Sequence, residues 1–162
     1  MDDRENDEFG AFYEAHRREV FRTAYPIAGD REEARDLTQE ALVRAFGRWS
    51  EVSHHEQPGA WLLTVVARLA ISWRRRQAIR SKRTPPSTSA VEDDISYEPA
   101  VLEALRRLTP AQRAVVVLGF FADRSVEDVA TALGKRPGTV KALTSQALDR
   151  LRPLLEARGV RT

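Results

Sequence analysis

The sequence predicts an all-α fold of two small helical domains joined by a flexible linker. Three observations support this class. Apolar residues recur at three- and four-residue steps over much of the 162-residue chain, as expected for amphipathic helices. No segment alternates between apolar and polar residues strictly enough to predict a strand. Residues 82–98 contain two prolines, three serines, two threonines and an acidic cluster, a composition typical of a linker.

Two helices are expected in the first 50 residues. Apolar residues over positions 9–24 predict a first helix that ends near Pro26 and Gly29. Asp30 is a suitable N-cap for a second helix, with Glu33 three residues on as in a capping box. The inner face of this second helix is predicted from the spacing of Ala34, Leu37, Ala41, Leu42, Ala45 and Trp49.

A third helix is expected to open at Pro58, because proline suits the first helical position. This helix combines tryptophans with many basic residues: Arg68, Arg74, Arg75, Arg76, Arg80, Lys82 and Arg83. Clustered arginines attract phosphate, and a tryptophan face can stack on an unpaired base. The alternative is that the tryptophans are core residues beside a solvated helix end. Trp61 favours this alternative because it shares an apolar row with Leu62 and Val65, whereas Trp73 fits either interpretation.

The expected domains are residues 1–81 and 99–162, with residues 82–98 as the linker. A long loop within one compact domain is the less favourable alternative, because structureless loops of this length are unusual there. Four short helices are expected in the second domain. Thr109 and Ser125 are candidate N-caps for two of them.

The segment over residues 125–152 predicts a helix-turn-helix motif. Gly134 can end a short first helix in the left-handed conformation, and Pro137 can open a second helix after a short turn. The outward face of the second helix carries small and polar residues, so Lys141 and Gln146 could reach base edges or phosphates in a major groove. An ordinary helical hairpin with a solvated face is the alternative.

Charge is distributed unevenly along the chain. Residues 1–56 carry 14 acidic against 8 basic residues, and residues 57–91 carry 7 basic residues and no acidic one. Residues 92–162 are nearly balanced, with 10 acidic and 11 basic residues. This pattern predicts two binding surfaces of opposite charge.

Several classes of protein are not expected. The absence of cysteine excludes disulfides and thiolate metal sites. No phosphate-binding glycine loop, nucleophile elbow or acid–base pair is recognisable, so neither an enzyme nor a bound cofactor is predicted. His54 and His55 are adjacent in a predicted loop. Adjacent histidines on a loop seldom converge on one point as metal ligands must, so no metal site is expected there. The longest uncharged stretch, residues 57–67, is too short to cross a bilayer, and the acidic N-terminus lacks a signal-peptide core, so a cytoplasmic protein without membrane insertion is expected.

Two long runs carry a family resemblance. Residues 29–49, GDREEARDLTQEALVRAFGRW, followed by PGAWLLTVVARLAISWRRR, resemble conserved region two of the extracytoplasmic-function (ECF) sigma factors. Residues 108–152, from LTPAQRAVVV to ALDRLR, resemble region four of the same family. The amino-acid sequence of these runs is most similar to an actinobacterial branch of the family. The resemblance covers nearly the whole chain except its first residues and the linker.

The resemblance implies a role for each matching position. The partners implied are core RNA polymerase, through its β′ clamp and β flap, promoter DNA and an anti-sigma factor. Residues 50–57 match the loop that captures a flipped base. Core-polymerase contacts are implied for Asp36, Leu37, Gln39 and Glu40. Contacts with the minus-ten element are implied for Arg68, Trp73, Arg74, Arg75 and Arg76. Contacts with the minus-thirty-five element are implied for Arg136, Thr139, Lys141, Ser145 and Gln146.

Departures from the family pattern concern the promoter sequence more than the function. Arg68 stands where relatives often carry Asn, and Gln146 stands where Arg is common. Arg136 replaces a frequent capping Ser, so Pro137 must help to define the start of that helix. A stand-alone helix-turn-helix regulator is the main alternative, but it would give the acidic N-terminal half no role and would normally bind a palindrome as a dimer. A helical adaptor that binds polymerase without contacting DNA is a second one, and the basic stretch argues against it.

Overall fold

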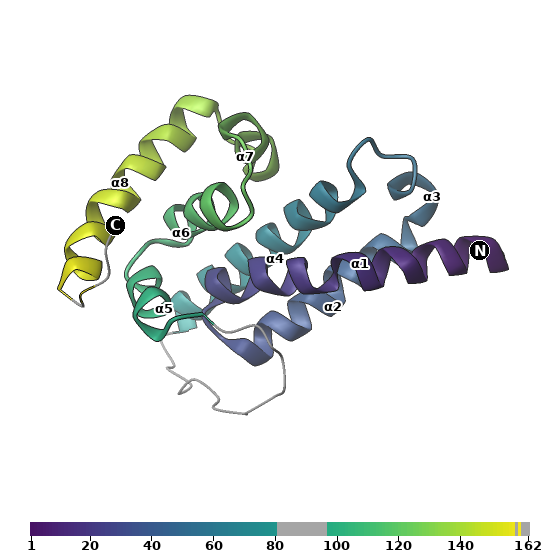
Figure 1. The fold of residues 1–162 in the computed structure, drawn as a ribbon, viewed down its shortest axis with the longest axis horizontal. Coiled ribbons are helices and arrows are strands. Elements are labelled where there is room, and N and C mark those ends of the chain that lie inside the picture. Colours follow the sequence, from purple (N-terminus) through teal and green to yellow (C-terminus); the bar gives the residue numbers. More distant parts are fainter. Residues whose placement is uncertain (81–96, 158, 160–162) are drawn as a thin grey trace.

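The computed structural model describes residues 1–80, 97–157 and 159, and all regular structure in these ranges is helical (Figure 1). This confirms the predicted all-α class. The elements are α1 (Asp3–Ala28), α2 (Arg31–Gly47), α3 (Trp49–Val52), α4 (Pro58–Arg80), α5 (Pro99–Arg106), α6 (Pro110–Val116), the π-helical turn η1 (Val117–Phe121), α7 (Val126–Leu133) and α8 (Pro137–Glu156). None of the helices in these ranges has both the length and the hydropathy needed to cross a bilayer.

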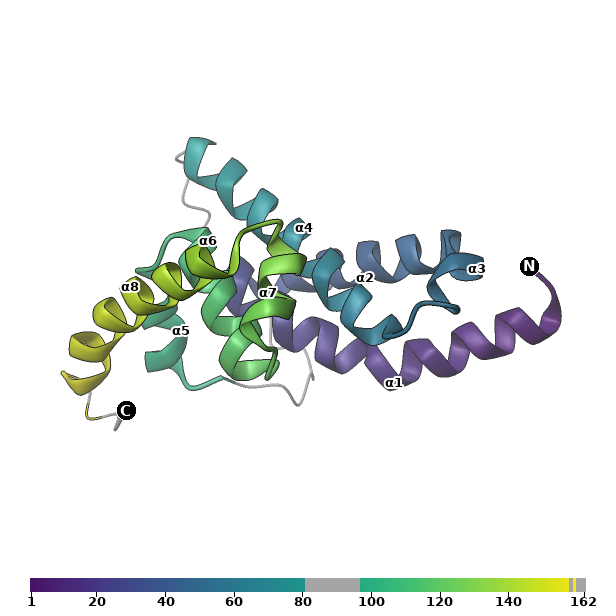
Figure 2. The same ribbon diagram turned by 90° about the horizontal axis from the view of Figure 1, so that it is seen from above.

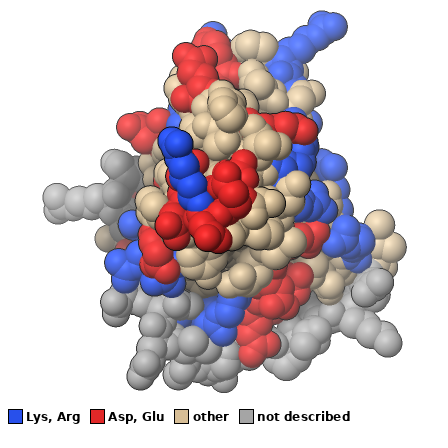
Figure 3. All heavy atoms as spheres, turned by 90° about the vertical axis from the view of Figure 1, so that its right-hand side faces the viewer, with Lys and Arg blue, Asp and Glu red and all other residues tan. Residues whose placement is uncertain are grey.

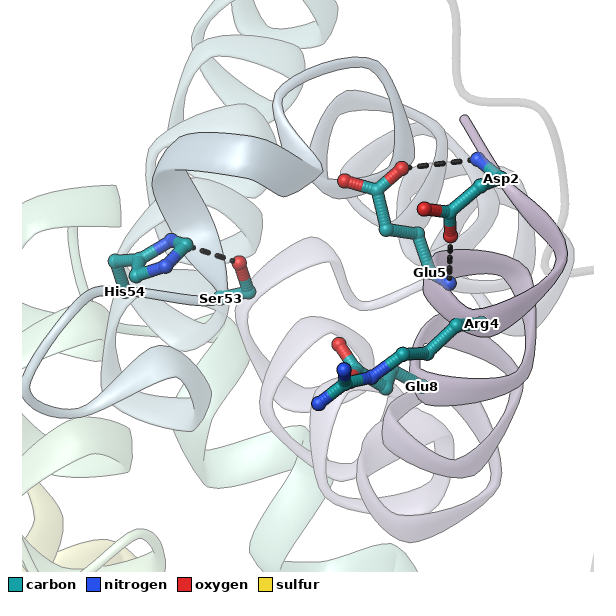
Figure 4. Close-up of polar contacts among 6 residues, drawn as sticks. All are labelled: Asp2, Arg4, Glu5, Glu8, Ser53 and His54. Carbon is teal, nitrogen blue, oxygen red and sulfur yellow. Dashed lines mark hydrogen bonds and ion pairs between the residues drawn. The ribbon is translucent and has the colours of Figure 1, made fainter.

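Helix α1 begins earlier than its apolar residues suggest. The Asp2 carboxylate accepts the Glu5 backbone N–H at 2.8 Å, and the Glu5 carboxylate accepts the Asp2 N–H at 2.9 Å (Figure 4). This reciprocal pair is a capping box, and it satisfies two amide groups that an uncapped helix end leaves free. The spacing of Asp2 and Glu5 was a usable sequence signal that the apolar pattern overlooks.

The predicted end of α1 near Pro26 and Gly29 is confirmed, because the helix ends at Ala28. Pro26 does not end the helix but lies inside it, and the chain turns at Gly29, which has φ 76°. Proline has no N–H, so it leaves the carbonyl of the residue four positions earlier, Arg22, without its helical partner. The Tyr97 hydroxyl donates a hydrogen bond to this carbonyl. A side chain from the second half of the chain therefore supplies the bond that Pro26 removes.

Helix α2 follows the sequence closely. The Asp30 carboxylate accepts the Glu33 N–H at 2.9 Å, which confirms the predicted N-cap. The predicted inner-face residues on α2 are buried against α1 and α4. Trp49 is also buried, but it begins the short helix α3 because α2 ends at Gly47. The loop expected after α2 is partly helical, because α3 occupies its first residues.

Local signals also define the C-terminal helices. Thr109 and Ser125 cap α6 and α7 through the N–H groups of Gln112 and Asp128. Gly134 ends α7 with φ 63°, and proline opens α8, as predicted. The helix expected to run from residue 110 to about 121 changes type within this span. Its last turn, η1, widens to π-helix geometry, with the Ala122 N–H donating to the Val117 carbonyl at 3.0 Å.

The two halves of the chain lie against each other. Helix α6 lies between α8 and α4, and α7 packs against α4 (Figures 1 and 2). The buried apolar residues of both halves form one continuous core. Tyr97, at the end of the predicted linker, stacks on Tyr25 of α1 with ring centroids 5.9 Å apart. Linker residues 82–96 lie outside the described residues, so the division into domains stays a prediction.

Candidate functional site

A row of carboxylates follows one side of α2. Asp30, Glu33, Asp36 and Glu40 are spaced by three or four residues, so their side chains are neighbours on the helix surface. Asp36, Gln39 and Glu40 of the predicted polymerase-binding set are exposed. Leu37 is only 3% exposed and lies in the core, where it positions the helix. At the end of the molecule where α1 begins, acidic side chains also gather around one basic side chain, with further basic ones toward the edges of the view (Figure 3).

The pKa of the Glu33 carboxyl is raised in this row. Burial raises the pKa of its carboxyl, and repulsion from Asp36 and Asp30 raises it further, while Arg76 acts in the opposite direction. Carboxylates that repel one another in the free protein favour binding to a cationic surface, because a partner relieves the repulsion.

Two exposed apolar residues extend the polar row on α2. Val43 is 66% exposed and Phe46 is 45% exposed. The Phe46 ring contacts the edge of Phe9, with centroids 5.1 Å apart. The sequence analysis did not identify these two residues as part of a binding surface. Their position outside the predicted inner face was the available signal. We define the α2 face as Asp36, Gln39, Glu40, Val43 and Phe46.

The segment over residues 50–57 is held by its own hydrogen bonds. Nδ1 of His54 lies 2.8 Å from the Ser50 carbonyl. The same atom lies 3.2 Å from the Ser53 hydroxyl (Figure 4). A carbonyl only accepts, so Nδ1 carries the proton of that bond. Nδ1 of His55 accepts the Gln57 N–H at 3.1 Å. Both rings are exposed, and no group of three His, Asp or Glu within the described ranges could hold a metal ion.

The basic residues of α4 divide between two sides of the helix. Arg75 follows Arg68 by two helical turns, so both share one side, with Arg76 nearby. Arg75 and Arg76 are exposed. Arg74 is half-buried, and burial together with the neighbouring Arg106 lowers its pKa. The predicted minus-ten set is therefore not a single surface.

Arg68 is engaged by the other half of the chain. Its Nε donates to the Ala132 carbonyl at 2.6 Å, and a terminal nitrogen lies 3.4 Å from the Thr131 carbonyl. Both carbonyls belong to the last turn of α7. Trp73, like Trp61, is half-buried and packs against the core. The packing of Trp61 is in keeping with the core interpretation.

Helix α8 presents the predicted contact residues to solvent. Its inner side buries Val140, Ala147 and Leu151. Gln146 accepts a long hydrogen bond, 3.5 Å, from the Gln112 side chain. Arg136 occupies the N-cap position with extended backbone and makes no capping bond, so Pro137 begins the helix as expected. The exposed set is Arg136, Thr139, Lys141, Ser145 and Gln146.

Two family models match the chain in succession. Sigma-70 region 2 matches residues 12–79, and Sigma-70, region 4, matches residues 99–151. The first match contains the α2 face and the basic residues of α4. The second contains the helix-turn-helix formed by α7 and α8. The surfaces described above therefore lie inside the two matched regions.

Similar proteins agree with these matches. The RNA polymerase sigma-E factor of Streptomyces avermitilis is 34% identical over 157 residues, covering 94% of this chain and 88% of the relative. The ECF RNA polymerase sigma factor SigL of Mycobacterium tuberculosis is 30% identical, covering 93% and 90%.

Solved structures share the fold. The sigma factor RpoE of Bartonella quintana, crystallised with the anti-sigma factor NepR, superimposes with a TM-score of 0.75 at 24% identity, covering 92% of this chain and 97% of that one. The ECF sigma factor SigJ of Mycobacterium tuberculosis has a TM-score of 0.66 at 26% identity, covering 87% of this chain and 52% of its own. Taken with the two regional matches and the sequence relatives, this chain belongs to the extracytoplasmic-function family of RNA polymerase sigma factors.

Proposed function

We propose that this chain binds core RNA polymerase in the cytoplasm, directs it to promoters and assists DNA melting, without catalysing a reaction itself. One observation carries the proposal. A single chain holds an acidic face on α2, clustered arginines on α4 and a helix-turn-helix, in the order of region 2 and region 4. A stand-alone regulator needs only the last of these.

The α2 face is proposed to dock on the β′ clamp. Its exposed carboxylates are complementary to a basic coiled coil, which favours encounter and correct orientation. Val43 and Phe46 add exposed apolar area beside them, and burying this area in the complex contributes affinity that salt does not screen. The second half of the chain is proposed to contact the β flap.

The two DNA surfaces are proposed to act on different promoter elements. Helix α8 would enter the major groove of the minus-thirty-five element, where Lys141, Ser145 and Gln146 would contact base edges or phosphates. The α4 arginines with Trp73 would contact the melted minus-ten strand, mainly through phosphates. The histidine-containing segment over residues 50–57 would hold a base flipped out of the stack.

An anti-sigma factor is proposed as a further partner. The superimposable RpoE structure was solved with its anti-sigma factor NepR. An inhibitor that covers either the α2 face or the DNA surfaces would keep this chain away from polymerase.

Run-off transcription tests the proposal. Core polymerase from a related actinobacterium should produce a defined transcript from the DNA upstream of this chain's own gene only when the chain is added. The same reaction with the Asp36→Lys, Glu40→Lys double variant is the matched negative control. Absence of any transcript stimulated by the chain, with core polymerase shown to be active with another sigma factor, would refute the proposal.

A further inference from the structure

Helix α6 buries an amide side chain against the helix that is proposed to enter the major groove. Gln112 and its neighbour Arg113 are buried polar side chains of α6, with 8% and 1% of their surface exposed. Helix α6 packs along α8 (Figure 1), where Gln146 occupies an exposed position. A buried amide needs hydrogen-bond partners within the protein. The partners of Gln112 therefore show what its burial achieves.

The Gln112 amide connects the start of α6 to Gln146 of α8. Its Oε1 accepts the Thr109 backbone N–H at 3.2 Å, as part of the α6 capping box. Its Nε2 donates to Oε1 of Gln146 over a long hydrogen bond of 3.5 Å. The direction of both bonds is fixed by the first, because a backbone N–H only donates. The cap holds the Gln112 oxygen at Thr109, so the Gln112 nitrogen faces α8 and the Gln146 oxygen faces α6.

This arrangement determines which polar atom Gln146 presents to DNA. With its oxygen directed to α6, Gln146 has its Nε2 left to face the groove, and an amide nitrogen only donates. A glutamine that recognises adenine uses both atoms, the oxygen on the N6 amino group and the nitrogen on N7. A donor alone instead suits guanine, whose N7 and O6 both accept. It does not suit cytosine, whose N4 amino group also donates.

We propose that Gln112 is a positioning residue for promoter recognition, which orients Gln146 to select guanine over cytosine at one base of the minus-thirty-five element. Because Gln112 is buried, it acts through Gln146 and not by contact with DNA. This inference rests on the proposed function, since it requires α8 to lie in the major groove. It adds the chemical class of base that Gln146 selects and the residue of α6 that determines the choice.

Reversing the bond between the two glutamines tests this role. A carboxylate at position 112 keeps the capping box, because Glu accepts the Thr109 N–H as Gln does. Its other oxygen accepts where the Gln112 nitrogen donated. In Gln112→Glu, Gln146 should therefore turn its nitrogen to α6 and its oxygen to DNA. An outward oxygen accepts from cytosine N4 and is repelled by guanine O6 and N7, so the order of the two bases should reverse.

Competition binding measures the order of bases. The full chain with core polymerase binds a labelled duplex of the promoter found by run-off transcription, and duplexes with each minus-thirty-five base pair changed in turn compete with it. The base that Gln146 faces is the one whose preference changes most in Gln146→Ala. There the natural chain should favour guanine over cytosine by about two- to tenfold, the range expected for one hydrogen bond. Gln112→Glu should favour cytosine by a similar factor.

Three control variants distinguish positioning from charge and stability. Ala111→Glu adds the same charge to the neighbouring position of α6, so it should weaken binding to all duplexes alike and keep the natural order of bases. Gln112→Met removes the bond without adding charge, so the preference for guanine over cytosine should be lost. In a Gln146→Ala background, Gln112→Glu should change no base preference. Thermal unfolding followed by circular dichroism shows whether each variant is folded, and Gln112→Met tests the role by itself if the carboxylate prevents folding.

Three results would overturn the positioning role. The first is a natural chain that does not favour guanine over cytosine at the base identified by Gln146→Ala. The second is a folded Gln112→Glu or Gln112→Met variant that keeps the natural order of these bases. The third is a change of order that persists in the Gln146→Ala background. Any of these with normal run-off transcription by the natural chain would remove this role alone, whereas loss of chain-dependent transcription would remove the proposed function.

Discussion

Arg113 shows what a single residue can contribute to this fold. An arginine in a short helix is ordinarily expected at the surface, and nothing near it in the sequence indicates otherwise. Its partners explain its burial, since one of them, the Ile27 carbonyl, lies 86 residues away. The planar guanidinium can satisfy several carbonyls at once, which a lysine cannot do in the same way. Such a role depends on tertiary structure and leaves no local signal.

Replacing Arg113 should destabilise the chain strongly. Arg113→Met would remove the guanidinium donor from the Ile27 and Leu108 carbonyls and leave the Leu105 carbonyl with only the Leu108 N–H, at a cost of about 3 kcal/mol or more. Arg113→Lys should lie between this variant and the natural chain, because one ammonium group has a different geometry and reach. Urea unfolding monitored by circular dichroism gives the free energies.

The exposed neighbour provides the control for Arg113. Arg107→Met should change the free energy of unfolding by less than about 0.5 kcal/mol. Equal stabilities of the Met variants at positions 107 and 113 would show that the buried hydrogen bonds contribute nothing net.

At the scale of elements, the starts and stops of helices were predictable where their signals are local. Asp30, Thr109 and Ser125 each cap the helix that follows, and Gly134 ends α7 as its sequence context indicates. Capping depends on residues within one helical turn, so a short sequence window contains the information. The position of Pro26 inside α1 was not predictable in this way, because the Tyr97 hydroxyl that compensates for it lies in the other half of the chain.

The α2 face supplies a prediction about polymerase binding. The double variant Asp36→Lys, Glu40→Lys should reduce affinity for core polymerase at least tenfold, because two attractive charge contacts become repulsive. Its binding to duplex minus-thirty-five DNA should stay at least as strong as that of the natural chain. Fluorescence anisotropy with labelled chain measures the first quantity, and filter binding measures the second.

A charge-matched variant distinguishes the effect of the α2 face on polymerase affinity from the effect of net charge. Asp7→Lys with Glu14→Lys on α1 makes the same change in net charge at exposed positions outside the α2 face. It should retain most of the affinity for core polymerase. If both double variants lost affinity equally, long-range charge and not the α2 face would explain docking.

Helices α4 and α8 should make different contacts with DNA, α4 mainly with phosphates and α8 with base edges. Gln146→Ala should change preference at particular minus-thirty-five bases, with roughly 1–3 kcal/mol of discrimination for each good base contact. Replacing Arg74, Arg75 and Arg76 by Ala should weaken binding to all promoters and flatten its dependence on salt, because phosphate contacts carry no base information.

A pre-melted template distinguishes these two effects. On a bubble promoter the triple-arginine variant should regain part of its activity, since the opening step is already made. The Gln146→Ala variant should keep its altered base preference on the same template. A triple-arginine variant that changed only base preference and opened duplex DNA normally would contradict this division.

For the whole molecule, the helices and charged surfaces of each half were predictable from the sequence, whereas the packing of the two halves on each other was not. Helical periodicity, the change from acidic to basic composition and the two family resemblances indicated the all-α class and the separate surfaces. The packing of α6 and α7 on α4, and the capping by Arg68, were not predictable. The Arg68 bonds join residues more than 60 positions apart, and the helix packing depends on matching surfaces that no local window contains. Val43 and Phe46 were missed for a different reason, because exposed apolar residues resemble ordinary helix positions in a sequence.

The most direct test of the account is a footprint of the chain on the promoter found by run-off transcription. With core polymerase present, protection is expected at two sites separated by roughly 25 base pairs, about 85 Å of duplex, and permanganate should modify unpaired thymines only at the downstream site. Without polymerase, the chain should give neither the double footprint nor reactive thymines. A single palindromic footprint formed by the chain alone, unchanged by polymerase and without melted thymines, would contradict the central claim.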